Sequence, residues 1–278
     1  MQTQSRRRFL RESTLSLAAL ATPLSITVAQ SRRVERIGLQ LYTLRNEMAQ
    51  DFEGTLEKLA ELGFKEMQFA GYHGRSPADV RRILDRLGLT SPAAHVGLNL
   101  LREDVDREIE IAGEIGQHYM VVPSLPGDER TLADYERHAE ALNEYGRRAK
   151  EAGLSIGYHN HSFEFEVQNN EIGYNYLLNL TDPDLVAFEL DLFWAVNANA
   201  NPIEIFENNP GRFPMVHVKD RNDAGEMVDV GRGVIDFAEI FSHSDTAGIK
   251  HYFVEHDRPS DGINSVAYSY NTVNNIRF

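Results

Sequence analysis

Four short apolar segments in the second half of the chain each end in side chains that can bind a metal ion. They are LSIGYHNH (154–161), VAFELD (186–191), MVHVKD (215–220) and YFVEHD (252–257). Apolar, β-branched and aromatic residues bounded by turn residues predict buried strands. His159, Asp191, His217 and Glu255 stand where these segments become polar, about thirty residues apart, which is the length of a βα repeat. This spacing predicts a barrel that gathers the carboxyl ends of its strands on one face.

The remainder of the chain continues the same alternation of strand-like and helix-like segments. Residues 37–43 form a first apolar segment, and Asp51 then begins a helical pattern that ends at Gly63. Counted to the end of the chain, the pattern gives eight strands, each followed by a helix-like segment. The strands are too apolar to have a solvent-exposed face, which indicates a parallel sheet covered by helices. The predicted fold is an α/β protein, a single-domain (β/α)8 TIM barrel over residues 31–278.

Composition excludes some classes of partner and limits the chemistry of a metal site. The chain has 278 residues and a formal net charge of −14. Binding to nucleic acid or to an anionic membrane needs a basic surface, so neither is expected. Because the chain has no cysteine, it has no disulfides and no thiolate ligands, and a metal would have to be bound by His, Asp and Glu.

The first thirty residues have the features of an export signal rather than of a folded domain. Residues 5–11 read SRRRFLR, a twin-arginine sequence, and an uncharged stretch rich in Leu, Ala, Ser and Thr follows over 13–29. This order predicts a twin-arginine signal peptide over residues 1–30, with cleavage after Ala29 and a periplasmic mature protein. No apolar segment is long enough to span a membrane, so the mature protein is expected to be soluble.

Asp191, His217 and Glu255 are the leading candidates for metal ligands. An isolated Asp at a strand end is more often a helix cap, and an isolated His is more often structural. Three separate strands that each end in a ligand type at a similar position are unlikely by chance, and this joint placement carries the hypothesis. Carboxylates with imidazole favour one divalent ion such as Mn²⁺, Mg²⁺, Co²⁺ or Zn²⁺. Open coordination positions would bind neighbouring oxygens of a sugar or keto-alcohol and stabilise an enediolate.

Six sequence motifs resemble those of the sugar phosphate isomerase/epimerase family, the xylose isomerase-like barrels. The motifs are GLQLYTLR (38–45), GYHNHSFEF (157–165), ELDLFWA (189–195), HVKD (217–220), DVGRGVIDF (229–237) and VEHD (254–257). The resemblance extends from residue 37 to about the end of the chain. It implies one divalent metal held by Glu, Asp, His and Glu after the fifth to eighth strands, and a dimer or tetramer.

The resemblance implies three of the four ligands directly and leaves the first position open. Asp191, His217 and Glu255 match the last three ligands, but His159 stands where the family has its first Glu, and the nearest carboxylate is Glu164. Either His159 binds the metal or Glu164 folds back into the vacant position, and the HNHxxEF pattern favours Glu164. Glu255 is the expected catalytic base, with His159 or Glu164 as the opposing acid. The departure argues against simple epimerisation by two glutamates.

Five further residues are candidates for substrate contacts. His95 and His161 could donate to sugar hydroxyls or relay protons. Lys219 lies two residues beyond His217 on the same strand face and could neutralise an enediolate. Trp194 offers a flat surface for a sugar ring, and Arg232 could cover the pocket from the seventh loop.

The expected function is a periplasmic, metal-dependent isomerase or epimerase of an unphosphorylated sugar or keto-sugar. A 3-keto-glycoside lyase or hydratase is the closest alternative, because the same site could remove a proton next to a ketone and then expel an oxygen. An endonuclease-IV-like phosphodiesterase would need more metal ligands and a basic groove. A sugar-binding barrel without turnover would keep the pocket alone.

Overall fold

The computed structural model describes residues 31–278, and Arg32–Phe278 form one compact unit. The predicted signal peptide therefore lies outside the described residues. Within them, no helix combines the length and apolar character needed to cross a membrane.

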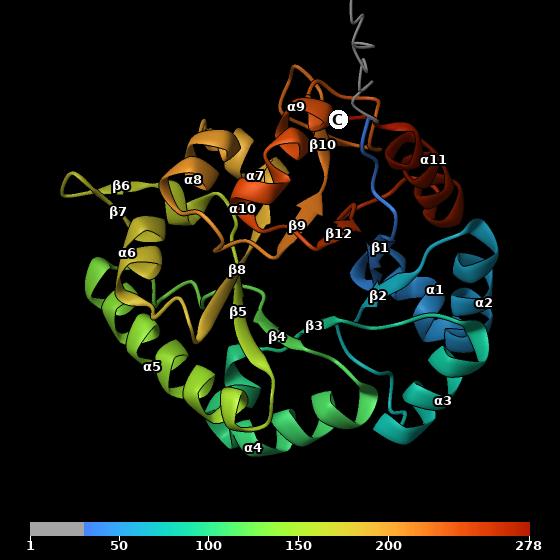
Figure 1. Ribbon diagram of the computed structural model, residues 1–278, viewed down its shortest axis with the longest axis horizontal. Coiled ribbons are helices and arrows are strands. Elements are labelled where there is room, and N and C mark those ends of the chain that lie inside the picture. Colours follow the sequence, from blue (N-terminus) through green and yellow to red (C-terminus); the bar gives the residue numbers. More distant parts are fainter. Residues whose placement is uncertain (1–30) are drawn as a thin grey trace, which may run out of the picture. The chain divides into compact units, whose positions relative to one another are not determined.

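Eight parallel strands form the barrel, and helices surround it (Figure 1). The strands are β1 (Ile37–Gln40), β2 (Glu66–Gln68), β3 (Ala93–His95), β4 (Tyr119–Val122), β5 (Ser155–His159), β8 (Val186–Asp191), β9 (Met215–Val218) and β12 (His251–Val254). They pair in the order β2-β1-β12-β9-β8-β5-β4-β3, and isolated parallel bridges between Glu66 and Thr90 and between Phe69 and Ala94 join the two edges. The predicted single-domain TIM barrel is confirmed.

The helices and the minor strands fill the connections between the barrel strands. The helices are α1 (Arg45–Gln50), α2 (Phe52–Leu62), α3 (Pro77–Leu87), α4 (Leu98–Ile115), α5 (Leu132–Glu151), α6 (Gly173–Leu180), α7 (Leu192–Asn197), α8 (Pro202–Asn208), α9 (Phe237–Ser242), α10 (Ser244–Ala247) and α11 (Gly262–Asn275). Short 3₁₀ helices are η1 (Leu41–Leu44) and η2 (Phe163–Phe165), and two antiparallel pairs join β6 (Val167–Gln168) to β7 (Glu171–Ile172) and β10 (Asp220–Arg221) to β11 (Met227–Val228).

Local sequence signals explain where several of these helices begin and end. The Asp51 side chain accepts a hydrogen bond from Gly54 N and caps α2, which ends at Gly63 with φ of 109°. Thr131 and Asp134 form a capping box at the start of α5. The first strand is shorter than predicted because the chain turns into η1 after Gln40, whose side chain accepts from Tyr42 N.

Alternate residues of each strand face two different cores. Val216 and Val218 of β9 belong to the large outer core beneath the helices, whereas Met215 packs with Phe253, Val121, Tyr119 and Ala93 inside the barrel. Because side chains alternate along a strand, the residues two positions beyond this interior layer also point inward, above it. This alternation determines which side chains reach the upper end of the barrel.

Two helical glycines make opposite predictions for stability. A Cβ on Gly146 of α5 would lie 2.6 Å from the backbone oxygen of Leu185, whereas a Cβ on the exposed Gly113 of α4 meets nothing within 4 Å. We expect Gly146→Ala to destabilise the fold by about 1–3 kcal/mol through overpacking. Gly113→Ala should stabilise it by about 0.5–1 kcal/mol, because alanine favours the helix. Urea unfolding of both variants measures this, and equal effects of the two substitutions would contradict the packing of α5.

Candidate metal centre

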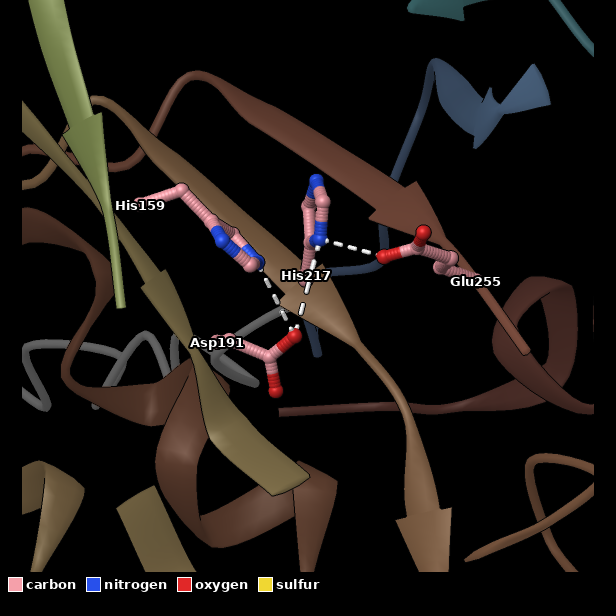
Figure 2. Close-up of side chains that lie close together, drawn as sticks. All are labelled: His159, Asp191, His217 and Glu255. Carbon is pink, nitrogen blue, oxygen red and sulfur yellow. Dashed lines mark hydrogen bonds and ion pairs between the residues drawn. The ribbon is translucent and has the colours of Figure 1, made fainter. Parts of the chain in front are cut away.

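Four buried side chains meet at the upper end of the barrel interior (Figure 2). His159, Asp191, His217 and Glu255 each offer one ligand atom, and these atoms all lie within 4.8 Å of one another. Asp191 Oδ2 lies 3.2 Å from His159 Nε2 and 3.6 Å from His217 Nδ1, and Glu255 Oε2 lies 2.7 Å from His217 Nδ1. We call these four residues the tetrad.

The strand alternation places the tetrad above the apolar interior of the barrel. Met215 lies two residues before His217, and Phe253 lies two residues before Glu255. Both belong to the interior core. On β9 and β12, the inward-facing side chains therefore change from apolar to metal-binding between one inward position and the next. The register aligns Asp191 with His217 across β8 and β9. The fold thus converts residues far apart in sequence into a single cluster.

Two tetrad atoms fit a cation better than they fit each other. His217 Nδ1 is buried and forms no well-directed hydrogen bond with Glu255 Oε2, although these atoms lie 2.7 Å apart, and Oε2 has the Lys219 ammonium as its neighbour. Buried polar atoms without partners are rare and point to a missing partner such as an ion. Two imidazoles and two carboxylates suit Zn²⁺, Co²⁺ or Mn²⁺. The residues present therefore fit one divalent cation.

Contacts outside the tetrad orient two of its members. His159 Nδ1 lies 3.0 Å from the carbonyl oxygen of Pro123 and must donate its proton there, which leaves Nε2 free as a ligand. Asp191 uses Oδ1 to cap α7 by accepting from Trp194 N, while Oδ2 faces the tetrad. Asp191 therefore acts as a helix cap and a candidate ligand at once.

Lys219 balances part of the negative charge around the tetrad. Its Nζ lies 3.0 Å from Asp191 Oδ2, 2.7 Å from Glu255 Oε2 and 2.9 Å from Asp257 Oδ1. Burial alone would lower the pKa of Lys219, but the attraction of these carboxylates is larger and raises this pKa above its ordinary value. The side chain is thus held as an ammonium beside the tetrad.

Glu164 lies outside the tetrad and has a different role. Its carboxylate is fully buried and accepts hydrogen bonds from the Tyr158 hydroxyl at 2.7 Å and from His161 N at 2.8 Å. It therefore fixes the loop after β5. His159, and not Glu164, is the fourth member of the tetrad. The prediction that Glu164 folds back to bind the metal therefore does not fit the geometry.

A cavity of about 920 Å³ opens above the tetrad. Four of the five predicted substrate contacts line it: His95, His161, Trp194 and Lys219. Arg232 does not. Its exposed guanidinium pairs with Asp229 and stacks over the Tyr268 ring, 4.2 Å from the ring centroid. The expectation that Arg232 covers the pocket is therefore corrected, because it packs against α11 instead.

His161 lines the cavity and has a buried imidazole nitrogen without a hydrogen-bond partner among the described residues. This nitrogen is Nδ1, and the His161 ring contacts the rings of Phe163 and Trp194, with centroid distances of 5.8 Å and 5.5 Å. Burial lowers the pKa of His161 to about 3, so this ring is neutral over the physiological range.

The sequence interpretation missed residues that support the tetrad from below. Glu189, Gln68 and Gln40 are fully buried and form a hydrogen-bonded group beside His217 and His95. Glu189 was detectable in the sequence, since it lies two residues before Asp191 and must share its face of β8. Gln40 and Gln68 end the short strands β1 and β2, where an amide carries no distinctive signal.

Comparison with known proteins agrees with this architecture. The sequence profile described as "Xylose isomerase-like TIM barrel" matches residues 56–269. The chain belongs to the xylose isomerase-like TIM barrel family. The predicted family resemblance is thereby confirmed for the barrel.

The similar proteins include inosose dehydratases and a sugar phosphate isomerase/epimerase. "Inosose dehydratase 2" of Bacillus cereus is 30% identical over 244 residues, which cover 73% of this chain and 80% of that protein. An inosose dehydratase of Geobacillus kaustophilus is 24% identical over 228 residues, covering 67% and 73%. A crystal structure of a sugar phosphate isomerase/epimerase from Parabacteroides distasonis ATCC 8503 is 29% identical with a TM-score of 0.74, covering 88% of this chain and 97% of that one. These relatives support a sugar-modifying barrel enzyme.

Glu164 generates a prediction for stability against pH. Burial, which outweighs its hydrogen bonds, raises the pKa of Glu164 from 4.5 to about 7, so the folded chain holds this proton more tightly than the unfolded chain. The contribution of Glu164 to stability should therefore fall as pH rises from about 4.5 to about 7, and Glu164→Gln should lack this change. The difference between the two proteins should change by on the order of 2–3 kcal/mol.

Urea unfolding of metal-free protein at several pH values between 4.5 and 8 measures this difference. Glu166→Gln, at an exposed position of the same loop, is the matched control and should follow the wild type. A constant difference between wild type and Glu164→Gln across this range would contradict the assignment.

Proposed function

We propose that this protein is a divalent-metal-dependent lyase of the dehydratase type, acting on a keto-polyol such as a keto-cyclitol or keto-sugar. The observation that carries the proposal is the tetrad below a cavity of about 920 Å³. The similarity to inosose dehydratases over 73% of the chain supports this choice of reaction.

The proposed reaction removes a proton from the carbon next to a ketone and then expels an oxygen from the following carbon. A bound cation would polarise the ketone oxygen and make the neighbouring C–H bond more acidic. The electrons of the broken C–H bond form a C=C bond, the C–O bond breaks, and the leaving oxygen takes up a proton to give water. The reaction is redox-neutral and needs no further cofactor.

Glu255 is the proposed base that removes this proton. It belongs to the tetrad through Oε2 and also lines the cavity. Lys219, held as an ammonium beside it, would stabilise the negative charge that forms on the substrate. Both groups approach the cavity from neighbouring strand ends, β12 and β9.

The opposing acid is neither of the two residues that the sequence suggested. His159 uses Nδ1 to bond Pro123 and directs Nε2 into the tetrad, so neither nitrogen is free to transfer a proton. Glu164 does not line the cavity. His161 lines the cavity, but its ring is neutral and cannot supply this proton, so we propose that Glu255 returns the proton it has removed to the leaving oxygen, with His161 as a neutral neighbour of that oxygen.

Isomerisation or epimerisation is the second candidate, favoured by the likeness to the Parabacteroides distasonis structure. It would share the first proton removal but return the proton to carbon instead of expelling an oxygen. Elimination from a 3-keto-glycoside would also share that step, with the glycosidic oxygen as leaving group. Product analysis therefore separates these reactions, whereas loss of activity in a variant does not.

A direct test incubates the Mn²⁺-loaded protein in D₂O with an inosose, a keto-sugar and a 3-keto-glycoside, followed by NMR. The proposal predicts loss of water and a conjugated enone from the inosose or the keto-sugar. Deuterium on carbon with all oxygens retained would identify an isomerase or epimerase. Release of an aglycone alone would identify a glycoside lyase, and binding without deuterium uptake or product would leave only a sugar-binding protein.

The assignment of the fourth ligand makes a separate prediction about metal affinity. His159→Ala should weaken Mn²⁺ or Zn²⁺ binding at least tenfold, because it removes a direct ligand and leaves the carboxylates of the tetrad without a neighbour. Glu164→Gln should leave that affinity within about twofold of wild type. Competition with a chromophoric chelator measures both, and the reverse order of effects would show that Glu164 is the ligand.

A further inference from the structure

Beneath the tetrad, Glu189 connects two imidazoles through a chain of hydrogen bonds. Its carboxylate is fully buried on β8. Oε2 lies 2.8 Å from His95 Nε2 and 3.1 Å from His217 Nε2, and Oε1 accepts from Gln68 Nε2 at 2.6 Å. A buried charge with this many partners is costly to place and points to a positional role.

The direction of each hydrogen bond in this chain follows from Glu189. A carboxylate only accepts, so the NH₂ of Gln68 must face Glu189 and the Gln68 oxygen must face the other way. That oxygen lies 2.6 Å from His217 Nε2. His217 therefore carries a proton on Nε2, so Nδ1, which faces Asp191 and Glu255, is the nitrogen left to bind a cation.

Gln40 holds the same orientation from the opposite side. Its oxygen accepts from Tyr42 N at 3.1 Å, which turns its NH₂ toward Gln68, and that NH₂ donates to the Gln68 oxygen at 2.7 Å. Two independent contacts thus orient the Gln68 amide. The position of the proton on His217 therefore follows from the Gln68 amide. That amide is oriented by the Glu189 carboxylate on one side and, through Gln40, by the backbone N–H of Tyr42 on the other.

Glu189 orients the cavity imidazole by the same logic. His95 Nε2 must donate to the carboxylate, so its Nδ1 lone pair is left unprotonated. The His95 ring lies nearly parallel to the His217 ring, 5.2 Å between centroids, and lines the cavity. One carboxylate therefore determines which nitrogen of each ring is available above it.

We propose that Glu189 is a positioning residue that fixes the His217 tautomer through Gln68 and thereby presents Nδ1 to the metal. The inference rests on the metal site of the proposed function but not on the reaction. Carboxylate or amide groups behind a ligating imidazole raise its basicity, and their loss costs about 10–100-fold in metal affinity.

The test measures Co²⁺ binding by the full chain, without any substrate. Glu189→Gln replaces an acceptor by an amide that can turn its NH₂ toward Gln68 or toward the imidazoles, so the order of donors is lost. We expect Co²⁺ affinity to fall about 10–100-fold and the visible absorption of bound Co²⁺ to change. Gln68→Met, which removes the acceptor facing His217 Nε2, should have the same two effects.

Glu66→Gln is the matched control. Glu66 is also a buried barrel glutamate bonded to an imidazole, with its Oε2 2.8 Å from His251 Nδ1, but it is not part of the tetrad. Its substitution should leave the Co²⁺ affinity within about twofold of wild type and the spectrum unchanged. The double variant Glu189→Gln/Gln68→Met should lose little more Co²⁺ affinity than the single variant that binds Co²⁺ more weakly, because both substitutions act through His217.

Wild-type affinity and spectrum in both Glu189→Gln and Gln68→Met would overturn the proposal. If circular dichroism shows that Glu189→Gln does not fold, Gln68→Met alone decides. A wild-type chain that binds no Co²⁺ would overturn both the metal site and this inference. Weakened Co²⁺ binding in the variants, together with no turnover of keto-polyols by the wild type, would support the role of Glu189 while rejecting the proposed reaction.

Discussion

The two-residue alternation of the parallel strands is the constraint on which the rest of the structure depends. Inside the barrel it stacks a layer of apolar side chains, including Met215 and Phe253, below a layer of charged ones, including His217 and Glu255. The apolar layer fills the barrel below the charged layer, and the cavity opens above it. A shift of one residue in the register of any of these strands would direct its candidate ligand outward, into the core beneath the helices.

Burial of so many charges makes the centre unstable unless each charge has a partner. Asp191, Glu189 and Glu255 are almost fully buried, and removing such ions from water costs several kcal/mol each. Lys219 and His217 offset part of that cost through their contacts with these carboxylates. A divalent cation would complete the balance beside His217 Nδ1, which forms no well-directed hydrogen bond among the described residues.

The sequence predicted the barrel well because each strand and helix carries its own local signal. Apolar segments, caps such as Asp51 and helix-ending residues such as Gly63 recur at a regular spacing, and pairing order follows from that repeat. The sequence also predicted that Asp191, His217 and Glu255 meet at one end of the barrel, since parallel strands align their carboxyl ends.

What the sequence did not determine depends on distances within loops and between strands. The choice between His159 and Glu164 depends on where the loop after β5 turns, and the Tyr158 hydroxyl and His161 N hold the Glu164 carboxylate in that loop. Arg232 is directed away from the cavity by Asp229, three residues before it, and by Tyr268 of α11, a contact between distant residues that no local pattern reveals. The choice between isomerase and dehydratase depends on the fate of one carbon–oxygen bond, which ligand types alone do not decide.

The most direct measurement of the central claim is an anomalous-scattering map from crystals of the protein grown with Co²⁺. The account predicts one strong peak per chain, enclosed by His159 Nε2, Asp191 Oδ2, His217 Nδ1 and Glu255 Oε2. A peak bound by Glu164 instead, or an ordered barrel with no peak among these four side chains, would contradict it.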